Sequence, residues 1–175
     1  MPRRAAPRLL LAAAVALSLA ACGSDDSSGT AAPSCESRSA TAVAPDSIST
    51  DLTRAPEVPT TDAAPPCGLE ISDVVVGTGA EAVAGSAVAV KYVGSFYGTG
   101  EEFDASWNSG DDTTLPVTLG TGGVIEGFDQ GITGMHVGGR RMVVIPSELG
   151  YGDKTVGPIP AGSTLVFLID LVSVD

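Results

Sequence analysis

Residues 124–152 constrain the fold of this chain more than any other stretch. Four apolar residues at its start recur at steps of one, three and four, the spacing of one helix face: Val124, Ile125, Phe128 and Ile132. Two glycines inside this segment cost roughly 1 kcal/mol each in helix propensity, so a helix this short needs an apolar surface to lie on. A strand pattern follows at residues 140–145 and ends at Pro146. The stretch therefore predicts a short helix packed on a mainly β structure.

The sequence from Gly68 onward alternates between β-rich runs and turns rich in glycine and proline. The strand patterns cover residues 69–76, 85–97, 102–106, 115–119, 140–145 and 163–172. Pro116 cannot donate a backbone hydrogen bond, which puts its strand at an edge or a bulge. Five or six strands and one helix predict a single α+β domain over residues 68–175.

The first 21 residues have the pattern of a secretory signal. A basic start is followed by an apolar run over residues 9–21, which at about 13 residues is too short to span a bilayer comfortably. The segment Leu19-Ala20-Ala21-Cys22 resembles the lipobox of bacterial lipoproteins. That resemblance implies cleavage before Cys22 and a diacylglycerol on its thiol. An ordinary signal followed by an incidental cysteine is the alternative.

Residues 22–67 differ in composition from the rest of the chain. Ser, Thr, Ala, Pro and Asp dominate, and no aromatic residue is present. Such a segment buries too little apolar surface to offset its ordering entropy, so we expect a flexible linker that carries the lipid anchor. A short strand over residues 48–58, added to the edge of the domain, is a further expectation.

Three cysteines are present, and Cys22 is assigned to the lipid. The other two, Cys35 and Cys67, lie in a segment that we expect to be exported to an oxidising compartment. We therefore predict a Cys35–Cys67 disulfide, which would contribute roughly 3–4 kcal/mol by the loop-entropy estimate. Two free thiols are the alternative.

The charge of the chain limits its partners. Removal of residues 1–21 takes away three of nine basic residues and none of 21 acidic ones, which changes the formal charge from −12 to −15. This balance argues against binding to nucleic acid and against a basic membrane-binding patch. We therefore expect attachment to the outer face of the cytoplasmic membrane by lipid alone. We also expect a monomer, because no heptad repeat or long exposed apolar edge is present.

The residues that usually build metal sites or nucleophilic centres are scarce. His136 is the single histidine and no cysteine cluster accompanies it, so neither a zinc site nor a Ser-His-Asp triad is expected. The glycine-rich segments lack the spacing of a phosphate loop, and the paired aspartates lack the pattern of a calcium loop. An enzyme of this sequence would work without a metal, a covalent nucleophile or a cofactor.

A group of aromatic and aliphatic residues is the best candidate site. Its members are Tyr92, Phe96, Phe103, Val124, Ile125, Phe128, Tyr151, Ile159 and Phe167. A plain sheet core is the alternative for any one of them. The hydroxyls of Tyr92 and Tyr151 need polar partners when buried. Asp104 follows Phe103 directly, so a bulge would be needed to turn both side chains towards one cleft.

Eight short motifs resemble, in order and spacing, those of the FKBP-type peptidyl-prolyl cis-trans isomerases over about residues 69–175. The motifs are Val90-Lys91-Tyr92-Val93-Gly94, Phe103-Asp104-Ala105-Ser106, Val124-Ile125-Glu126-Gly127-Phe128-Asp129-Gln130-Gly131, Gly138-Gly139-Arg140-Arg141, Ile145-Pro146, Tyr151-Gly152, Ile159-Pro160 and Leu165-Val166-Phe167. The resemblance implies an antiparallel five- to six-stranded sheet wrapped around one short helix, with an apolar pocket between them and no cofactor.

The resemblance also implies a role for each candidate residue. The implied roles are a floor at Phe128, where the family usually has Trp; a base at Val124 and Ile125; walls at Tyr92, Phe103, Ile159 and Phe167; and polar rim contacts at Asp104 and Tyr151. The Ile125 N–H would donate to the ligand. Leu115 and Val117 stand where the family often has aromatics, and Thr155 and Val156 occupy the region of a frequent His. These departures imply a looser pocket that binds the macrolide inhibitors of the family weakly.

The implied activity is isomerisation of X–Pro bonds in exported polypeptides, which rotate slowly without a catalyst. An apolar pocket would achieve it by desolvating and twisting the amide. A lipid-anchored, chaperone-like binding module for proline-containing segments, with little or no turnover, is the alternative. The substitutions at Phe128, Leu115 and Val117 keep that alternative open.

Overall fold

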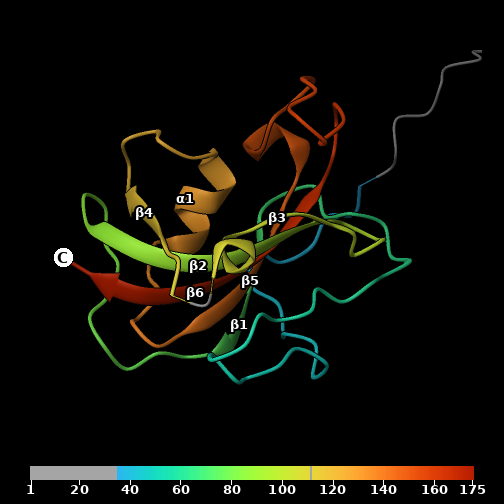
Figure 1. The fold of residues 1–175 in the computed structure, drawn as a ribbon. Helices are drawn as coiled ribbons and strands as arrows, with labels where there is room; N and C mark the ends of the chain where they lie inside the picture. The colour runs from blue at the N-terminus through green and yellow to red at the C-terminus, as the bar shows by residue number, and fades with distance from the viewer. Residues whose placement is uncertain (1–34, 111) are drawn as a thin grey trace, which may run out of the picture. The chain divides into compact units, whose positions relative to one another are not determined.

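The computed structural model describes residues 35–110 and 112–175 (Figure 1). Its strands are β1 (Glu70–Val75), β2 (Ala87–Phe96), β3 (Glu102–Ala105), β4 (Leu115–Thr118), β5 (Arg140–Ile145) and β6 (Leu165–Val174). The helical elements of the described part are α1 (Glu126–Ile132) and two short 3-10 helices, η1 (Ser106–Ser109) and η2 (Ser147–Leu149). The predicted α+β class is confirmed.

The strands form one antiparallel sheet in the order β1-β5-β6-β2-β3. The strand outside this path, β4, also pairs with β2, so two strands share one edge of β2. β4 pairs with the beginning of β2, from Ala87 to Val90, and β3 pairs with its end, from Val93 to Ser95. The predicted antiparallel sheet wrapped around one helix is confirmed as well.

Helix α1 packs on β5 at one face of the sheet, and Phe128 is buried there in the main core. The two glycines that lower helix propensity allow this close approach. A Cβ at Gly127 would overlap the side chain of Ile145, and a Cβ at Gly131 would lie 2.7 Å from Val143. Packing therefore requires the smallest residue at both positions, because interiors leave no room for an extra methyl group.

Residues 35–67, which we call the N-terminal strap, cover the opposite face of the sheet (Figure 1). Ile48 is 4 % exposed and packs in a second apolar cluster, whose sheet residues are Met142, Val144, Val166 and Leu168. The prediction of a flexible linker is therefore wrong for residues 35–67, and the folded unit begins before Gly68. The reason is that the sheet is apolar on both faces, so even a few large apolar residues find a surface to cover.

The strand expected over residues 48–58 is absent. The strap meets the sheet instead through an isolated parallel bridge between Thr41 and Ile71 of β1. Hydrogen bonds from the Ala42 N–H to the Ile71 carbonyl and from the Ile71 N–H to the Ala40 carbonyl hold this bridge. Pairing with the sheet is therefore local. The rest of the strap is held by side chains and by a backbone hydrogen bond of 3.1 Å from the Thr61 N–H to the Gly98 carbonyl.

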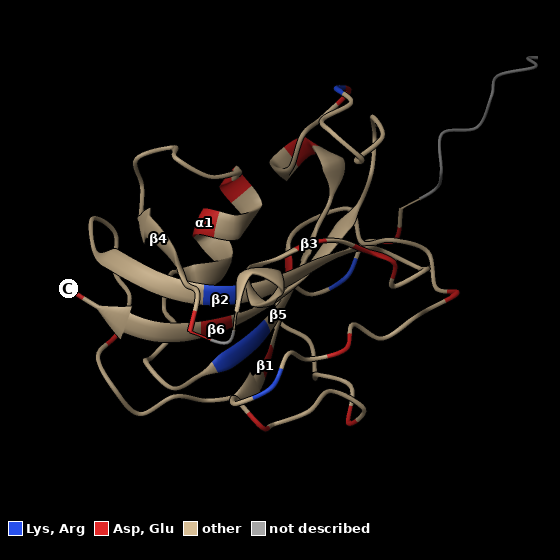
Figure 2. Cartoon of the chain, in the orientation of Figure 1, with Lys and Arg blue, Asp and Glu red and all other residues tan. Residues whose placement is uncertain are grey.

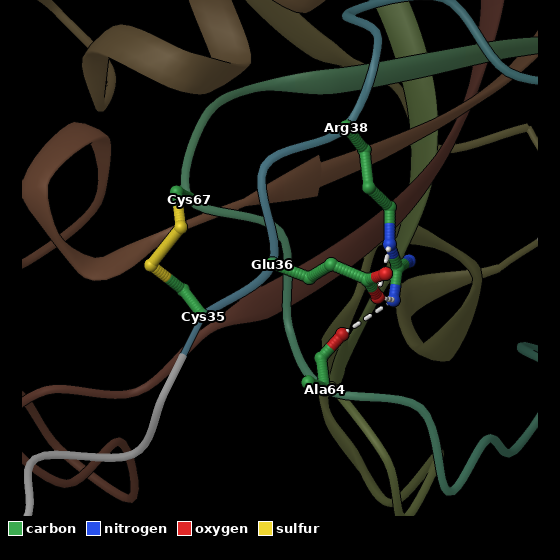
Figure 3. Close-up of a disulfide and its surroundings, with 5 residues drawn as sticks. All are labelled: Cys35, Glu36, Arg38, Ala64 and Cys67. Atoms are coloured by element: carbon green, nitrogen blue, oxygen red, sulfur yellow. Dashed lines mark hydrogen bonds and ion pairs between the residues drawn. A yellow bond between two sulfur atoms is a disulfide. The ribbon is translucent and has the colours of Figure 1, made fainter. Parts of the chain in front are cut away.

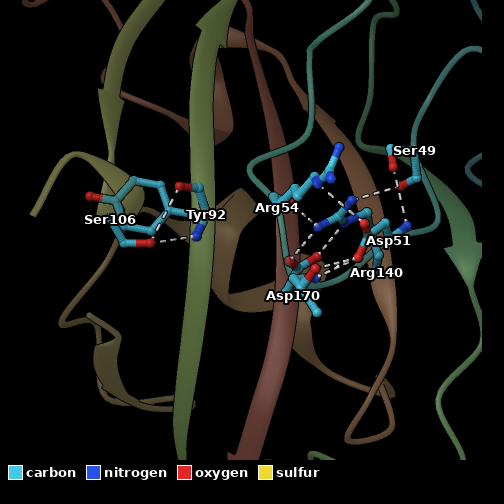
Figure 4. Close-up of polar contacts among 8 residues, drawn as sticks. Ser49, Asp51, Arg54, Tyr92, Ser106, Arg140 and Asp170 are labelled. Carbon is cyan, nitrogen blue, oxygen red and sulfur yellow. Dashed lines mark hydrogen bonds and ion pairs between the residues drawn. The ribbon is translucent and has the colours of Figure 1, made fainter. Parts of the chain in front are cut away.

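A buried arginine fixes the middle of the strap. Arg140 on β5 is 0 % exposed, and its guanidinium binds both carboxylate oxygens of Asp170 on β6 at 2.6 and 2.7 Å (Figure 4). The same guanidinium donates to the backbone carbonyls of Ser49 at 2.7 Å and Arg54 at 3.0 Å. A buried charge needs a counter-ion and filled hydrogen bonds, and the strap supplies the second requirement.

A disulfide between Cys35 and Cys67 joins the ends of the strap (Figure 3). The two Cα atoms lie 4.9 Å apart across a sequence separation of 32. Arg38, near the first cysteine, donates to the Glu36 carboxylate at 3.0 Å and to the Ala64 carbonyl at 2.6 Å. The structure thus contains the pairing expected from the sequence, and it closes the strap into a loop.

The predicted signal peptide, residues 1–21, and the predicted lipidation site, Cys22, lie outside the described residues. Within residues 35–110 and 112–175, no helix has the length and apolar character needed to cross a membrane.

Candidate functional site

A pocket of about 180 Å³ opens over α1 and the strands that face it. Its lining residues are Tyr92, Phe103, Asp104, Leu115, Gly123, Val124, Ile125, Phe128, Tyr151 and Phe167. Eight of the nine residues to which the resemblance assigns a role are among them, contributed by β2, β3, α1 with its N-terminal turn, the loop after η2, and β6. The structure therefore brings together residues that are up to 75 positions apart in the sequence.

The buried part of the pocket is a cluster of aromatic rings in edge-to-face contact. Phe128 and Phe167 lie with their centroids 5.1 Å apart at an interplanar angle of 77°. Tyr92 contacts Phe128 edge-on at 5.9 Å, and Phe103 contacts Phe167 edge-on at 5.7 Å. These geometries are the ones that aromatic pairs prefer. The rings therefore hold each other in place and give the pocket a rigid apolar wall.

Gly94 on β2 makes room for this arrangement. A Cβ at this position would lie 2.8 Å from the Phe167 ring and 2.9 Å from the Phe103 ring. Side-chain atoms essentially never approach carbon so closely, so any larger residue would push one ring away. Gly94 belongs to one of the motifs that resemble the family, but no sequence pattern predicts this role, because the two rings come from strands that are distant in the sequence.

A bulge in β3 turns two consecutive side chains towards the pocket. Gly94 pairs with Asp104, but Ser95 pairs with Glu102, so Phe103 is an extra residue on β3. In a regular strand, Phe103 and Asp104 would point to opposite faces. The bulge removes that restriction, and both residues line the pocket.

The polar rim is built on a short hydrogen bond. The Tyr92 hydroxyl donates to the Asp104 carboxylate at 2.6 Å. Burial, together with this hydrogen bond and the negative charge of Asp104, raises the pKa of the Tyr92 hydroxyl above its ordinary value. Tyr92 therefore keeps its proton at neutral pH and remains a donor.

Ile125 presents a backbone donor at the start of α1. It is the N-cap residue, with extended backbone angles, and its carbonyl accepts hydrogen bonds from the N–H groups of Phe128 and Asp129. Its own N–H donates no hydrogen bond to any part of the chain that the structure describes. An amide without a partner, next to a pocket, is available to a ligand carbonyl.

Phe96, a member of the candidate group without an assigned role, packs against the main core and does not line the pocket. Ile159 is the one residue with an assigned role that does not line it. Its side chain is buried in the main core, and its backbone exchanges two hydrogen bonds of 2.9 Å with Val156. The expectation that it forms a pocket wall is therefore corrected. Leu115 and Gly123 line the pocket in addition. Leu115 was noted only as a departure from the family pattern, and no sequence signal identified Gly123.

The elements that line the pocket carry charged residues of both signs (Figure 2). Asp104 is the single charged residue of the lining, and Figure 2 shows acidic residues on α1 and η2. Arg140 and Arg141 on β5 are held in ion pairs with Asp170 and Asp73. Among the described residues, no group of three or more potential ligands could hold a metal ion. The pocket can therefore offer apolar surface, a tyrosine hydroxyl, a carboxylate and a backbone donor.

Comparisons with known proteins agree on one family. The family model described as FKBP-type peptidyl-prolyl cis-trans isomerase matches residues 79–172. An FK506-binding protein of Streptomyces anulatus is 52 % identical over 121 residues, which cover 68 % of this chain and 96 % of the relative. A probable FK506-binding protein of Corynebacterium glutamicum is 50 % identical over 108 residues, 62 % of this chain and 88 % of the relative. The crystal structure of AtFKBP13 is similar, with a TM-score of 0.56, 40 % identity, and coverage of 62 % of this chain and 94 % of that one.

Proposed function

This chain belongs to the FKBP-type peptidyl-prolyl cis-trans isomerases, and we propose that its pocket isomerises X–Pro bonds in exported polypeptides. The observation that carries the proposal is the composition of the lining. Aromatic rings, one Tyr–Asp hydrogen bond and one backbone donor converge on a single cavity. Such a cavity suits a reaction that needs no covalent chemistry, and X–Pro rotation is one.

The barrier to X–Pro rotation comes from amide resonance and amounts to about 18–20 kcal/mol. Twisting the bond breaks the resonance, so the twisted amide is less dipolar than the planar one. A pocket that excludes water favours the less dipolar state, and this difference between transition state and ground state is what accelerates the reaction. A 10⁴-fold acceleration requires roughly 5–6 kcal/mol, which desolvation and orientation can supply together.

Each part of the pocket has a proposed task. The prolyl ring enters between Phe128, Phe167 and Tyr92, whose rings replace water around it. The Ile125 N–H donates to a substrate carbonyl and fixes the direction of the bound chain. The Tyr92–Asp104 pair holds the wall in position at the rim.

The proposed site of action is outside the cytoplasmic membrane, with Cys22 as the lipid anchor. The signal pattern of residues 1–21, the cysteine at the cleavage position and the Cys35–Cys67 disulfide support this placement. Labelling of growing cells with an alkyne fatty acid should mark the wild-type protein and the Cys35→Ala variant, but not Cys22→Ala. A wild-type protein that is processed without a label would refute the anchor and leave an ordinary signal.

The pocket should also bind FK506-type macrolides, since the relatives are named FK506-binding proteins. We propose that binding is weak because Phe128 offers less apolar surface than a Trp floor. Phe128→Trp buries additional apolar area, which should strengthen binding by roughly 1 kcal/mol. The dissociation constant for FK506 should therefore fall about fivefold. An unchanged or larger dissociation constant would contradict a loose pocket floor.

We also propose that the protein is a monomer. Light scattering of the purified protein should give the mass of a monomer.

The test of the activity is isomerisation of a tetrapeptide X–Pro substrate by the full chain. Asp104→Ala and Tyr151→Ala should lower kcat/KM by about tenfold or more, because both change the pocket rim. Asp46→Ala, an exposed carboxylate on the strap, is the matched control and should leave kcat/KM unchanged. No turnover, combined with saturable binding of a proline-containing peptide that Asp104→Ala weakens, would make this a binding module. If the protein shows no turnover and no binding of the peptide, the proposed use of the pocket is refuted.

A further inference from the structure

The edge of β2 that carries β3 and β4 has a gap at Tyr92. β4 pairs with β2 as far as Val90, and β3 begins its pairing at Val93. Tyr92 therefore has no opposing strand on that side, although it pairs with Ile169 of β6 on the other. Buried backbone groups without a partner are costly, so the Tyr92 N–H and carbonyl at the gap need another source of hydrogen bonds.

Ser106 supplies those hydrogen bonds with one hydroxyl. Its Oγ accepts from the Tyr92 N–H at 3.0 Å and donates to the Tyr92 carbonyl at 3.5 Å (Figure 4). The residue is 7 % exposed and stands at the first position of η1, directly after β3 ends. A side chain thus takes the place of a strand at the point where β3 leaves the sheet.

The position of Tyr92 decides the geometry of the pocket rim. Its ring lies edge-on to Phe128, and its hydroxyl donates to Asp104 at 2.6 Å. Asp104 and Ser106 are two residues apart, so the short segment that leaves β3 contacts Tyr92 at both the hydroxyl and the backbone. We propose that Ser106 is a positioning residue of the isomerase site, which fixes the Tyr92 backbone so that the Tyr92 hydroxyl stays on Asp104. This inference rests on the proposed function.

Ser95 on β2, the strand that carries Tyr92, provides a matched control for Ser106. Its side chain is 1 % exposed, and its hydroxyl has no hydrogen-bond partner among the described residues. Ser95→Ala therefore removes a buried hydroxyl of the same kind from β2 without touching the Tyr92 backbone. We expect wild-type kcat/KM for this variant.

The test is a double-mutant cycle in the full-length protein with Ser106→Ala, Tyr92→Phe and the double variant. Ser106→Ala should lower kcat/KM about tenfold, as expected when a pocket group is misplaced. In the Tyr92→Phe background the same change should lower it less than twofold, because the hydroxyl that Ser106 positions is already absent. Equal losses in both backgrounds, or no loss in either, would overturn the proposal. Should Ser106→Ala fail to fold, Ser106→Cys, which keeps the volume with a weaker hydrogen-bonding group, replaces it in the cycle.

An NMR titration separates this proposal from the proposed activity. The ¹³Cζ resonance of Tyr92 reports ionisation of its hydroxyl, and loss of the bond to Asp104 in Ser106→Ala should lower its pKa towards the ordinary value. Ser95→Ala should leave that titration unchanged. If the wild type has no isomerase activity, the proposed function fails and the titration alone decides the role of Ser106. An unchanged Tyr92 titration in Ser106→Ala would then overturn the positioning role.

Discussion

The Ile48→Ala substitution tests whether the N-terminal strap belongs to the folded domain. Ile48 is 4 % exposed and packs on the sheet face opposite α1, next to Met142 and Val144 of β5 and Val166 and Leu168 of β6. Truncation of a buried isoleucine removes its transfer free energy and leaves a cavity. A strap that moved freely as a linker would lose nothing from the same change.

The expected loss is about 2 kcal/mol in the free energy of unfolding. Buried isoleucine-to-alanine changes cost 2–5 kcal/mol, and the lower end applies because a strap can settle towards the sheet and close part of the cavity. Val43 on the same strap is 94 % exposed, so Val43→Ala should change the free energy by less than about 0.5 kcal/mol. The two variants remove similar side chains and differ in burial.

Urea unfolding of the oxidised full-length protein, followed by far-UV circular dichroism, measures both variants. A loss of about 2 kcal/mol corresponds to a fall in Tm of roughly 4–8 °C for a chain of this size. An Ile48→Ala protein as stable as Val43→Ala would refute the packed strap and restore the flexible linker. A lower m-value in Ile48→Ala would show instead that the strap has already left the sheet in the folded state.

Three further predictions concern the polar core, the pocket and pH. Asp170→Asn leaves the buried Arg140 guanidinium without its counter-ion, so it should lower the free energy of unfolding, measured in urea, by about 3–5 kcal/mol. Asp51→Asn changes an exposed carboxylate of the strap and should cost little. Gly94→Ala inserts a methyl group 2.8–2.9 Å from two pocket rings and should cost roughly 1–3 kcal/mol and lower kcat/KM, while Gly68→Ala, with open space around it, should do neither. Because burial raises the pKa of Tyr92 in the folded protein, the folded state keeps a proton that the unfolded state loses above about pH 10. Stability should therefore fall as pH rises beyond that value, by up to about 1.4 kcal/mol per pH unit, and Tyr92→Phe should show a shallower fall in the same range.

Local patterns predicted the elements of the sheet and the helix because those elements follow periodicities of two and 3.6 residues. The helix begins at Glu126, two residues later than the start of the apolar pattern, because Ile125 serves as the N-cap with extended backbone angles. Its glycines, which argued against a helix, fit the close contact with Ile145 and Val143. Propensity was outweighed by packing that no local pattern displays.

The strap was missed because its attachment is non-local. Its composition resembles that of a disordered linker, yet Arg140 binds the Ser49 carbonyl from 91 residues away. A signal was present in the last strand, where Asp170 interrupts an otherwise apolar run. A charged residue inside a central strand requires a buried partner, and an arginine at the start of another strand was the obvious choice. The sequence did not predict that backbone carbonyls of the strap, at Ser49 and Arg54, would accept the remaining hydrogen bonds of the Arg140 guanidinium.

The pocket was predictable only as a set. The resemblance to the family supplied the residues, and the fold brings together eight of the nine to which it assigns a role. The prediction for Ile159 did not hold, because the side chain of a residue in a Gly/Pro loop can turn to the core as easily as to a cleft. Ser106 and Gly94 act through groups that are distant in sequence, a backbone gap on β2 and two ring edges, so their roles depend on register and on the bulge in β3.

The strap is held by two different kinds of attachment, and they do different work. The Cys35–Cys67 bond restricts the unfolded strap by roughly 3–4 kcal/mol, but a closed loop could still swing away from the sheet. Ile48 and Arg140 seat it there. Alternate residues of β5 face the strap and α1, so the strap and the pocket share strands without sharing side chains. Strap substitutions should therefore change the free energy of unfolding with little effect on kcat/KM, whereas Ser106→Ala should lower kcat/KM beyond any loss of stability.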